Sequence, residues 1–318
     1  MRILGLAISA LSLAGVVWWA SRQQAPTFPD GGAELAALAA ALAAYGLGTA
    51  LRAERWQALL RAEGGAPGRA DSYGLTVVGF MGNNVLPARA GDAMRVYLMA
   101  PRSALRMRDV LGTLIAERVL DVAVLLGLFV LLAYGLLRGI DTPGGEVLGI
   151  AAVVVLCVGL AAAVTLRLAR GTPRGRWILD NLRPLVASTR GLRSARGLRL
   201  GGLTLGIWAA EAGCYLLVGR SVDISLSVIE ALYLIAVAGV FVLIPSGPGY
   251  AGTLDAAILF GLEAVGEGGA QSLSFLIMLR FVLLVPLTAG GLVLLLARYG
   301  GLAAERTATR RVSGGAAR

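Results

Sequence analysis

The stretch GFMGNNVLPARAGDAMR, residues 79–95, places two amides, a proline, two arginines and an aspartate inside a chain that is otherwise mostly apolar. The apolar segment that leads into it, residues 73–87, is shorter than the roughly 20 residues that a helix needs to cross a ~30 Å hydrocarbon layer. Irregular backbone at membrane depth is tolerated only where protein or water covers it. We therefore predict that this stretch turns back inside the membrane instead of crossing it.

A second interrupted segment lies in the C-terminal half of the chain. Residues 228–262 are strongly apolar, but IPSGPGYAG at residues 244–252 breaks them with Pro245, Pro248, Gly249 and Gly252. Proline removes a helical hydrogen bond, and glycine weakens a helix by about 1 kcal/mol relative to alanine. We predict a second re-entrant segment here. The alternative for both segments is that proline and glycine only kink two ordinary crossing helices.

Composition restricts the class of protein. Of the 318 residues, 57% are hydrophobic and 15% are charged, and the mean hydropathy of +0.76 favours an all-α polytopic membrane protein. All 29 cationic residues are arginines. The chain has no histidine, which excludes zinc sites and catalytic triads that use imidazole. The net charge of +10 fits cytoplasmic loops better than a nucleic-acid surface. Cys157 and Cys214 lie in apolar runs, so we expect no disulfide, metal or cofactor.

The arginines orient the predicted spans. Full crossings are expected at residues 3–20, 33–51, 110–137, 147–166, 202–219 and 272–297, six in total. Basic flanks, which include the segment 52–71, place both ends of the re-entrant segment 73–100 in the cytoplasm. The acidic loop at Glu263 and Glu267 places both ends of the segment 228–262 outside. Both chain termini then lie in the cytoplasm of a multi-pass plasma-membrane protein.

These predictions describe an inverted repeat. Residues 1–137 and 138–297 would each contain two spans, a re-entrant segment and a further span, in opposite orientations, as in many transporters with a midplane site. The arginine-rich linker 167–200 is either an amphipathic helix on anionic headgroups or only a determinant of topology. Residues 298–318 form a basic tail that we expect to be disordered.

Three ionisable residues in the segment 110–137 are candidates for function. Arg118 and Asp121 lie three residues apart and share a helix face, next to Glu117. A charged residue inside a membrane helix costs roughly 2.5–3.5 kcal/mol even on the mildest scale, and it normally faces a cavity or a partner. The alternative is a packing ion pair near the cytoplasmic end of the span.

Arg280 is a second intramembrane arginine, and no acid lies within several residues of it. Its partner is expected to be Asp255, Glu211 or an anionic ligand. Glu211 is either a structural partner or a proton carrier, and Glu117 is the other candidate for proton coupling. Tyr250 and Asp255, in the second interrupted segment, suit a lipid headgroup.

The first interrupted segment carries a predicted phosphate site. Asn84 can satisfy backbone groups that are freed at a turn, Pro87 ends the first limb, and Gly91 permits a tight reversal. Arg89 and Arg95 flank the start of the next helix, where free N–H groups also favour a phosphate. Alternatively, both arginines extend to the cytoplasmic headgroups as anchors.

Three motifs stand in order along the chain: Asn84-x-x-Pro87-x-Arg89-x-Gly91-Asp92-x-x-Arg95, then Glu117-Arg118-x-x-Asp121, then Pro245-x-x-Pro248-Gly249-x-x-Gly252-x-x-Asp255. Their order and spacing resemble the transmembrane region of the lysylphosphatidylglycerol synthase family, the flippase-like membrane proteins, over residues 5–297. Tyr250 stands where the family tends to have glycine, and Asp255 where it tends to have glutamate. The resemblance implies the lipid-translocating region without an aminoacylating domain.

We therefore predict a lipid flippase that moves an anionic, phosphate-containing or lipid-linked headgroup between leaflets. The predicted substrate-binding residues are Asn84, Arg89, Asp92, Arg95, Arg118, Asp121, Tyr250, Asp255 and Arg280. No Walker sequence is present, so we expect neither ATP use by this chain nor enzymatic activity. The alternatives are a non-catalytic membrane partner of a glycosyltransferase or lipid synthase, docking through residues 167–200, and an intramembrane enzyme with a carboxylate as general base.

Overall fold

A computed structural model of the chain describes residues 13–18, 20–86, 89–137, 195–241 and 247–299, and all regular structure in these ranges is helical. The helices are α2 (Gly32–Ala62), α3 (Arg69–Val85), α4 (Ala90–Ser103), α5 (Met107–Leu137), α8 (Ala195–Arg220), α9 (Val228–Phe241), α10 (Thr253–Ala264) and α11 (Gly269–Leu294). A short turn, η2 (Pro248–Tyr250), precedes α10, and η3 (Leu295–Tyr299) continues α11. The predicted all-α class is confirmed.

Within these ranges, three helices are long and apolar enough to cross a membrane: α2, α8, and α11 together with η3. The 26 residues of α8 extend about 39 Å at 1.5 Å per residue, which exceeds a ~30 Å hydrocarbon layer. Helix α5 has 31 residues, as many as α2, and it carries Glu117, Arg118 and Asp121 before a long apolar run. The predicted span 147–166, the linker up to residue 194 and the tail from residue 300 lie outside the described residues, as does most of the span 3–20.

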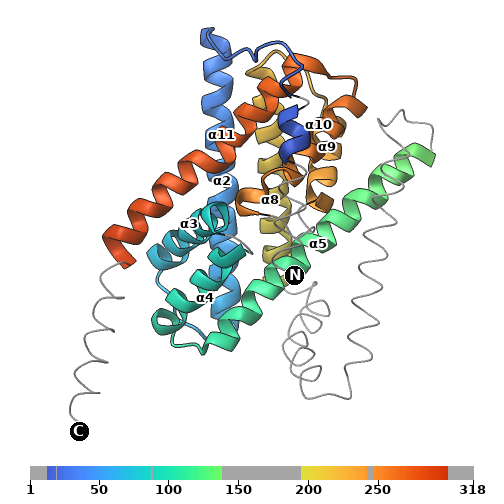
Figure 1. Cartoon of the computed structure of the whole chain (residues 1–318). Helices are drawn as coiled ribbons and strands as arrows, with labels where there is room; N and C mark the ends of the chain where they lie inside the picture. Colours follow the sequence, from blue (N-terminus) through green and yellow to red (C-terminus); the bar gives the residue numbers. More distant parts are fainter. Residues whose placement is uncertain (1–12, 19, 87–88, 138–194, 242–246, 300–318) are drawn as a thin grey trace.

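Helices α2 and α8 pack side by side (Figure 1). A Cβ atom added to Gly48 of α2 would lie 3.5 Å from the Cβ of Ala210 in α8, so a small residue allows this close approach. Helix α2 continues well past Leu51, where we predicted that it would end. Arg52 and Arg55, which we assigned to the flank after the span, lie on this helix, and acids on α8 and α5 compensate their charges.

Helices α3 and α4 form an antiparallel hairpin. At its open end, the backbone N–H of Ala66 donates a hydrogen bond of 3.1 Å to the carbonyl of Ser103. At its closed end, the Asn83 amide donates to Asp92 at 3.2 Å and accepts from the Asp92 backbone N–H at 3.3 Å. The chain therefore leaves the hairpin close to where it entered.

Close helix contact in this hairpin depends on glycine. A Cβ atom added to Gly82 of α3 would lie 2.6 Å from the Cα of Gly91, well inside van der Waals contact. Gly91, which we expected to permit a tight reversal, lies within α4 and not at the turn itself. Arg89 takes the left-handed conformation at the turn, with φ of 55°. Pro87 lies outside the described residues.

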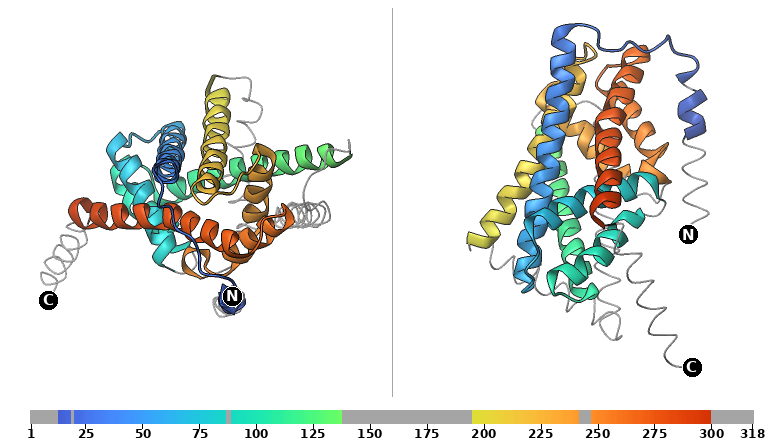
Figure 2. Two further views of the ribbon diagram at one scale, coloured as in Figure 1. Left: turned by 90° about the horizontal axis from the view of Figure 1, so that it is seen from above. Right: turned by 90° about the vertical axis from the view of Figure 1, so that its left-hand side faces the viewer.

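Helices α9 and α10 form a second hairpin at the opposite end of the bundle. A Cβ atom added to Gly261 of α10 would lie 2.6 Å from Leu234 of α9. In Figures 1 and 2, α9 and α10 occupy the upper part of the molecule and α3 and α4 the lower part. The closed ends of the hairpins meet: a Cβ atom on Gly249 would lie 3.4 Å from the carbonyl oxygen of Asn84. Pro245 lies outside the described residues.

The apolar core consists mainly of two clusters, one for each hairpin. One cluster surrounds Tyr233, Leu234 and Phe275 and joins α8, α9, α10 and α11. The other surrounds Trp56 and Leu75 and joins α2, α3, α4 and the start of α5. Each hairpin is thereby fixed in its own apolar cluster, and the polar closed ends are left to meet between them.

Candidate functional site

A cavity of about 240 Å³ lies where the closed ends of the two hairpins meet α2, α5, α8 and α11. This volume is below the roughly 300–1,000 Å³ of pockets that hold drug-sized ligands, so it suits a headgroup and not a whole lipid. Eight predicted substrate-binding residues line it: Asn84, Arg89, Asp92, Arg95, Arg118, Asp121, Tyr250 and Arg280. Glu211 also lines the cavity, whereas Asp255 and Glu117 lie directly behind the wall, each paired with a lining arginine.

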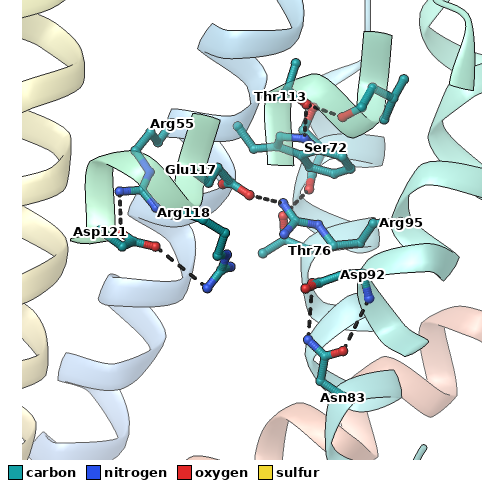
Figure 3. A network of polar contacts seen from close by, with 12 residues as sticks. Arg55, Ser72, Thr76, Asn83, Asp92, Arg95, Thr113, Glu117, Arg118 and Asp121 are labelled. Carbon is teal, nitrogen blue, oxygen red and sulfur yellow. Dashed lines mark hydrogen bonds and ion pairs between the residues drawn. The ribbon is translucent and has the colours of Figure 1, made fainter. Parts of the chain in front are cut away.

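Arg95 is held in the interior by a charge and a ring. Its Nη2 atom lies 3.1 Å from Oε2 of Glu117, and the two side chains are 5% and 2% exposed (Figure 3). Its guanidinium carbon lies 4.0 Å from the centre of the Trp56 ring, at cation–π distance. The alternative that Arg95 extends to surface headgroups is therefore wrong. Its Nη2 atom is engaged by Glu117, whereas its Nε atom has no hydrogen-bond acceptor among the described residues.

Asp121 is shared between two arginines, of which the sequence indicated one. Arg118, three residues earlier on α5, places Nη1 3.8 Å from Oδ2 of Asp121. Arg55 of α2 makes the shorter contact, 2.7 Å from Nη1 to Oδ1, and also donates to Thr204 of α8 at 3.1 Å. The Arg55 side chain is 1% exposed, whereas that of Arg118 is 46% exposed toward the cavity side of α5 (Figure 3). Of the two arginines, Arg118 therefore makes the weaker contact with Asp121.

Glu211 has a protein partner. Arg52 of α2 donates from Nη2 to its carboxylate, and both side chains line the cavity. Sequence analysis offered Glu211 as a partner for Arg280 or as a proton carrier and assigned Arg52 no role. The lone acid in α8 was a signal that a cation had to come from another helix, but the sequence does not say which one.

Arg280 closes the second hairpin. Its Nε atom donates to Asp255 at 2.5 Å, Nη1 donates to the carbonyl of Gly249 at 2.5 Å, and Nη2 donates to the carbonyl of Tyr250 at 3.2 Å. The second Asp255 oxygen accepts the backbone N–H of Gly252 at 2.8 Å, at the start of α10. Every nitrogen of Arg280 therefore has a partner in the break between α9 and α10, and the shorter carboxyl side chain of Asp255 still reaches it.

Tyr250 takes a conformation that favours glycine. Its φ is 55°, next to Gly249 at 59°, and a left-handed residue with a Cβ costs roughly 1–2 kcal/mol. A glycine at this position would avoid the cost. The Tyr250 ring lies 5.8 Å from the Arg89 guanidinium, so the aromatic side chain joins the two closed ends.

The first closed end is fixed by its own polar groups. Arg89 pairs with Asp92 at 3.5 Å, and Asp92 also accepts the Asn83 amide. The Asn84 amide donates to Thr288 of α11 at 3.0 Å, and this bond joins the break to a spanning helix. Asn84 is thus bonded to a side chain in a third helix and not only to the turn.

The charges in and directly behind the described part of the wall do not balance. The cations are six arginines: Arg52, Arg55, Arg89, Arg95, Arg118 and Arg280. The acids are five carboxylates: Asp92, Glu117, Asp121, Glu211 and Asp255. Six positive and five negative charges leave a net charge of one positive. Since Arg55 makes the shorter contact with Asp121, the excess charge is assigned to Arg118. A cavity with one uncompensated guanidinium suits one negative charge.

The fold and the site together define a polytopic helical membrane protein with broken helices around a charged interior cavity. Residues 2–291 match the family model described as the lysylphosphatidylglycerol synthase TM region, and the chain belongs to this family. It is also similar to the protein named Glycosyltransferase AglD of Haloferax volcanii, with 27% identity over 306 residues. That alignment covers 83% of this chain and 49% of the relative, so the chain spans about half of the relative's length. No solved structure matches the chain. The resemblance predicted from the three motifs is confirmed.

Proposed function

We propose that this protein moves a lipid with an anionic phosphate headgroup between membrane leaflets, and that Arg118 is the principal anion contact. The uncompensated positive charge at Arg118, in a cavity between two interrupted hairpins, carries the proposal. Without such a partner, a phosphate would meet a desolvation cost of many kcal/mol in hydrocarbon. The headgroup would occupy the cavity while the acyl chains stay in the surrounding lipid.

The proposed topology has six crossings and two re-entrant hairpins in an inverted repeat, residues 1–137 and 138–297, with both termini in the cytoplasm of the plasma membrane. The lengths of the hairpin helices support it. Helices α3, α4, α9 and α10 have 17, 14, 14 and 12 residues, all fewer than the roughly 20 needed to cross. The contact between Ala66 and Ser103 supports entry and exit of the first hairpin on one side.

Movement would be downhill or coupled to protons, without enzymatic chemistry. Glu117 and Glu211 remain the candidates for proton coupling, because each faces a single arginine that its protonation would release. An intramembrane enzyme would need a carboxylate free to act as general base. The acids that line the described cavity wall, Asp92, Asp121 and Glu211, are all in ion pairs, which favours transport over catalysis.

A second candidate function is that of a non-catalytic membrane partner of a glycosyltransferase or lipid synthase. The similarity to half of a protein named as a glycosyltransferase favours it. In this case the arginine-rich residues 167–200 would provide the docking surface. Deletion of these residues would abolish co-purification with such an enzyme and leave lipid movement unchanged, whereas a transporter loses lipid movement only when the cavity is altered.

The test is reconstitution in liposomes that carry a fluorescent anionic phospholipid, with chemical quenching of the outer leaflet. Arg118→Gln removes the charge and keeps a polar side chain, and we expect it to slow lipid movement at least tenfold. Arg199→Gln is the matched control, because Arg199 is exposed and pairs with Glu54, at 3.5 Å, away from the cavity lining. Equal rates for wild type and Arg118→Gln would refute the assigned anion contact.

A further inference from the structure

The cavity has a second wall, formed by α2 and α8, whose composition differs from the charged closed ends. On α2, Tyr45 and Arg52 are seven residues apart, and on α8, Trp208, Glu211 and Tyr215 follow at spacings of three and four. These spacings put each set on one face of its helix, so both faces look into the same space. The charges of this wall cancel, because Arg52 pairs with Glu211.

Aromatic rings concentrate around this cavity. The chain has 20 of them, from 7 Phe, 5 Trp and 8 Tyr. Five line the cavity: Tyr45, Phe80, Trp208, Tyr215 and Tyr250. Three of the five belong to the wall formed by α2 and α8. A pocket of this kind offers flat apolar faces to a ligand and a small number of polar groups that orient it.

Two buried donors in this wall lack acceptors. Trp208 Nε1 and Arg52 Nη1 are enclosed and make no hydrogen bond within the described ranges of the chain. A buried tryptophan N–H usually finds a partner, and leaving one unpaired costs about 1–3 kcal/mol. Both side chains line the cavity, so a ligand oxygen that came within hydrogen-bond distance of these atoms would satisfy them.

We infer that the headgroup is a phosphodiester that carries a neutral, hydroxyl-rich ring such as a sugar, with the phosphate at Arg118 and the ring against Trp208. This inference builds on the proposed function and names the class of its substrate. A sugar supplies apolar C–H faces for aromatic rings and oxygen atoms for the two donors. The single excess positive charge of the cavity matches the single negative charge of a phosphodiester.

An ammonium headgroup is the main competitor, because aromatic cages bind ammonium groups. The structure disfavours it here. The acid in this wall, Glu211, is already neutralised by Arg52, and the unpaired groups of Arg52 and Trp208 are donors, which an ammonium cannot accept. A ligand that accepts hydrogen bonds without adding charge fits these groups better than a cation does.

The test uses three isoprenyl phosphodiesters that share one chain and one charged phosphate but end in glucosyl, methyl or aminoethyl groups. Binding is measured by ligand-induced thermal stabilisation of the purified full chain in detergent. We expect the glucosyl diester to bind at least tenfold tighter than the methyl diester. Trp208→Leu should abolish this preference, Trp208→Phe should reduce it about threefold because the ring remains, and Arg118→Gln should weaken all three ligands.

Equal binding of the glucosyl and methyl diesters by wild type, or tightest binding of the aminoethyl diester, would overturn the inference. So would an equal loss of glucosyl and methyl binding in Trp208→Phe, the variant that best preserves packing. The two proposals fail separately. If liposomes show no movement of any diester but the glucosyl preference persists in detergent, only the transport proposal is wrong. If the methyl diester moves and no sugar preference appears, only this inference is wrong.

Discussion

The ion pair between Arg95 and Glu117 should hold α4 to α5, and Glu117→Gln tests this. The charged atoms lie 3.1 Å apart and both side chains are almost fully buried. At an effective dielectric constant of 20, two unit charges at this distance attract by about 5 kcal/mol. Removing one partner of a buried pair typically costs 3–5 kcal/mol, because the remaining charge stays buried without compensation. We therefore expect a loss of about 3–5 kcal/mol of stability.

Thermal unfolding of the detergent-solubilised protein measures this loss. At about 2 °C per kcal/mol for a chain of this size, the midpoint should fall by about 6–10 °C. The matched control is Arg199→Gln, which removes an exposed ion pair at 3.5 Å. Exposed pairs contribute roughly 0–1 kcal/mol, so its midpoint should change by no more than about 2 °C.

A paired replacement separates charge compensation from packing. Arg95→Met combined with Glu117→Leu removes both charges, leaves the net charge of the cavity unchanged, and should restore most of the stability lost in Glu117→Gln. A midpoint for Glu117→Gln within 2 °C of wild type would refute the structural role of the pair. A double variant less stable than Glu117→Gln would show that the cation–π contact with Trp56, and not the charge pair, dominates at this position.

Three further predictions concern packing, the second break and topology. Gly82→Ala should lower stability by about 1–3 kcal/mol, because the new methyl group would lie 2.6 Å from the backbone of α4. Gly46→Ala, where no atom lies within 4 Å of the new methyl group, should raise stability by about 0.5–1 kcal/mol. The thermal midpoints of both variants measure these changes. Arg280→Lys should destabilise the break between α9 and α10 by about 2 kcal/mol, visible as faster proteolysis there, because an ammonium cannot reproduce three directed contacts. Cysteines at residues 102 and 263 in a cysteine-free background should react with impermeant reagents from opposite sides, and labelling from one side would refute the proposed topology.

Local sequence determined the positions of the interruptions. Proline and glycine between residues 244 and 252, and the amides before Pro87, marked places where a helix could not continue. Helix α3 ends at Val85, and Gly249 and Tyr250 take left-handed conformations before α10. The shared helix face of Arg118 and Asp121 was equally predictable, because a spacing of three residues places two side chains together in any helix. Such features depend only on chain geometry within one element.

Long-range partners could not be predicted. The segment after Leu51 looked like a polar flank because a hydropathy scale gives arginine the same unfavourable value whether or not an acid compensates its charge. In the folded chain Arg52 meets Glu211, 159 residues away, and Arg55 meets Asp121, 66 residues away. The sequence showed unpaired acids in two other helices, but pairing them required knowing that α2 packs along α8 and beside α5. For Arg280 the short list of partners was correct, since Asp255 is the one it binds.

The pairing pattern also sets how tightly the cavity can hold an anion. Six free guanidiniums would bind a phosphate too strongly for release, and transport requires binding that is favourable but readily reversed. In this cavity most of the arginines are engaged by a short or enclosed acid contact, whereas Arg118 is held at 3.8 Å by a carboxylate that Arg55 also holds at 2.7 Å. In the proposed transporter, a phosphate would take Arg118 from Asp121 without leaving that carboxylate unpaired, and Asp121 would take Arg118 back when the headgroup leaves. Only one contact would change at a time, so the empty cavity would contain one uncompensated positive charge and the loaded cavity none.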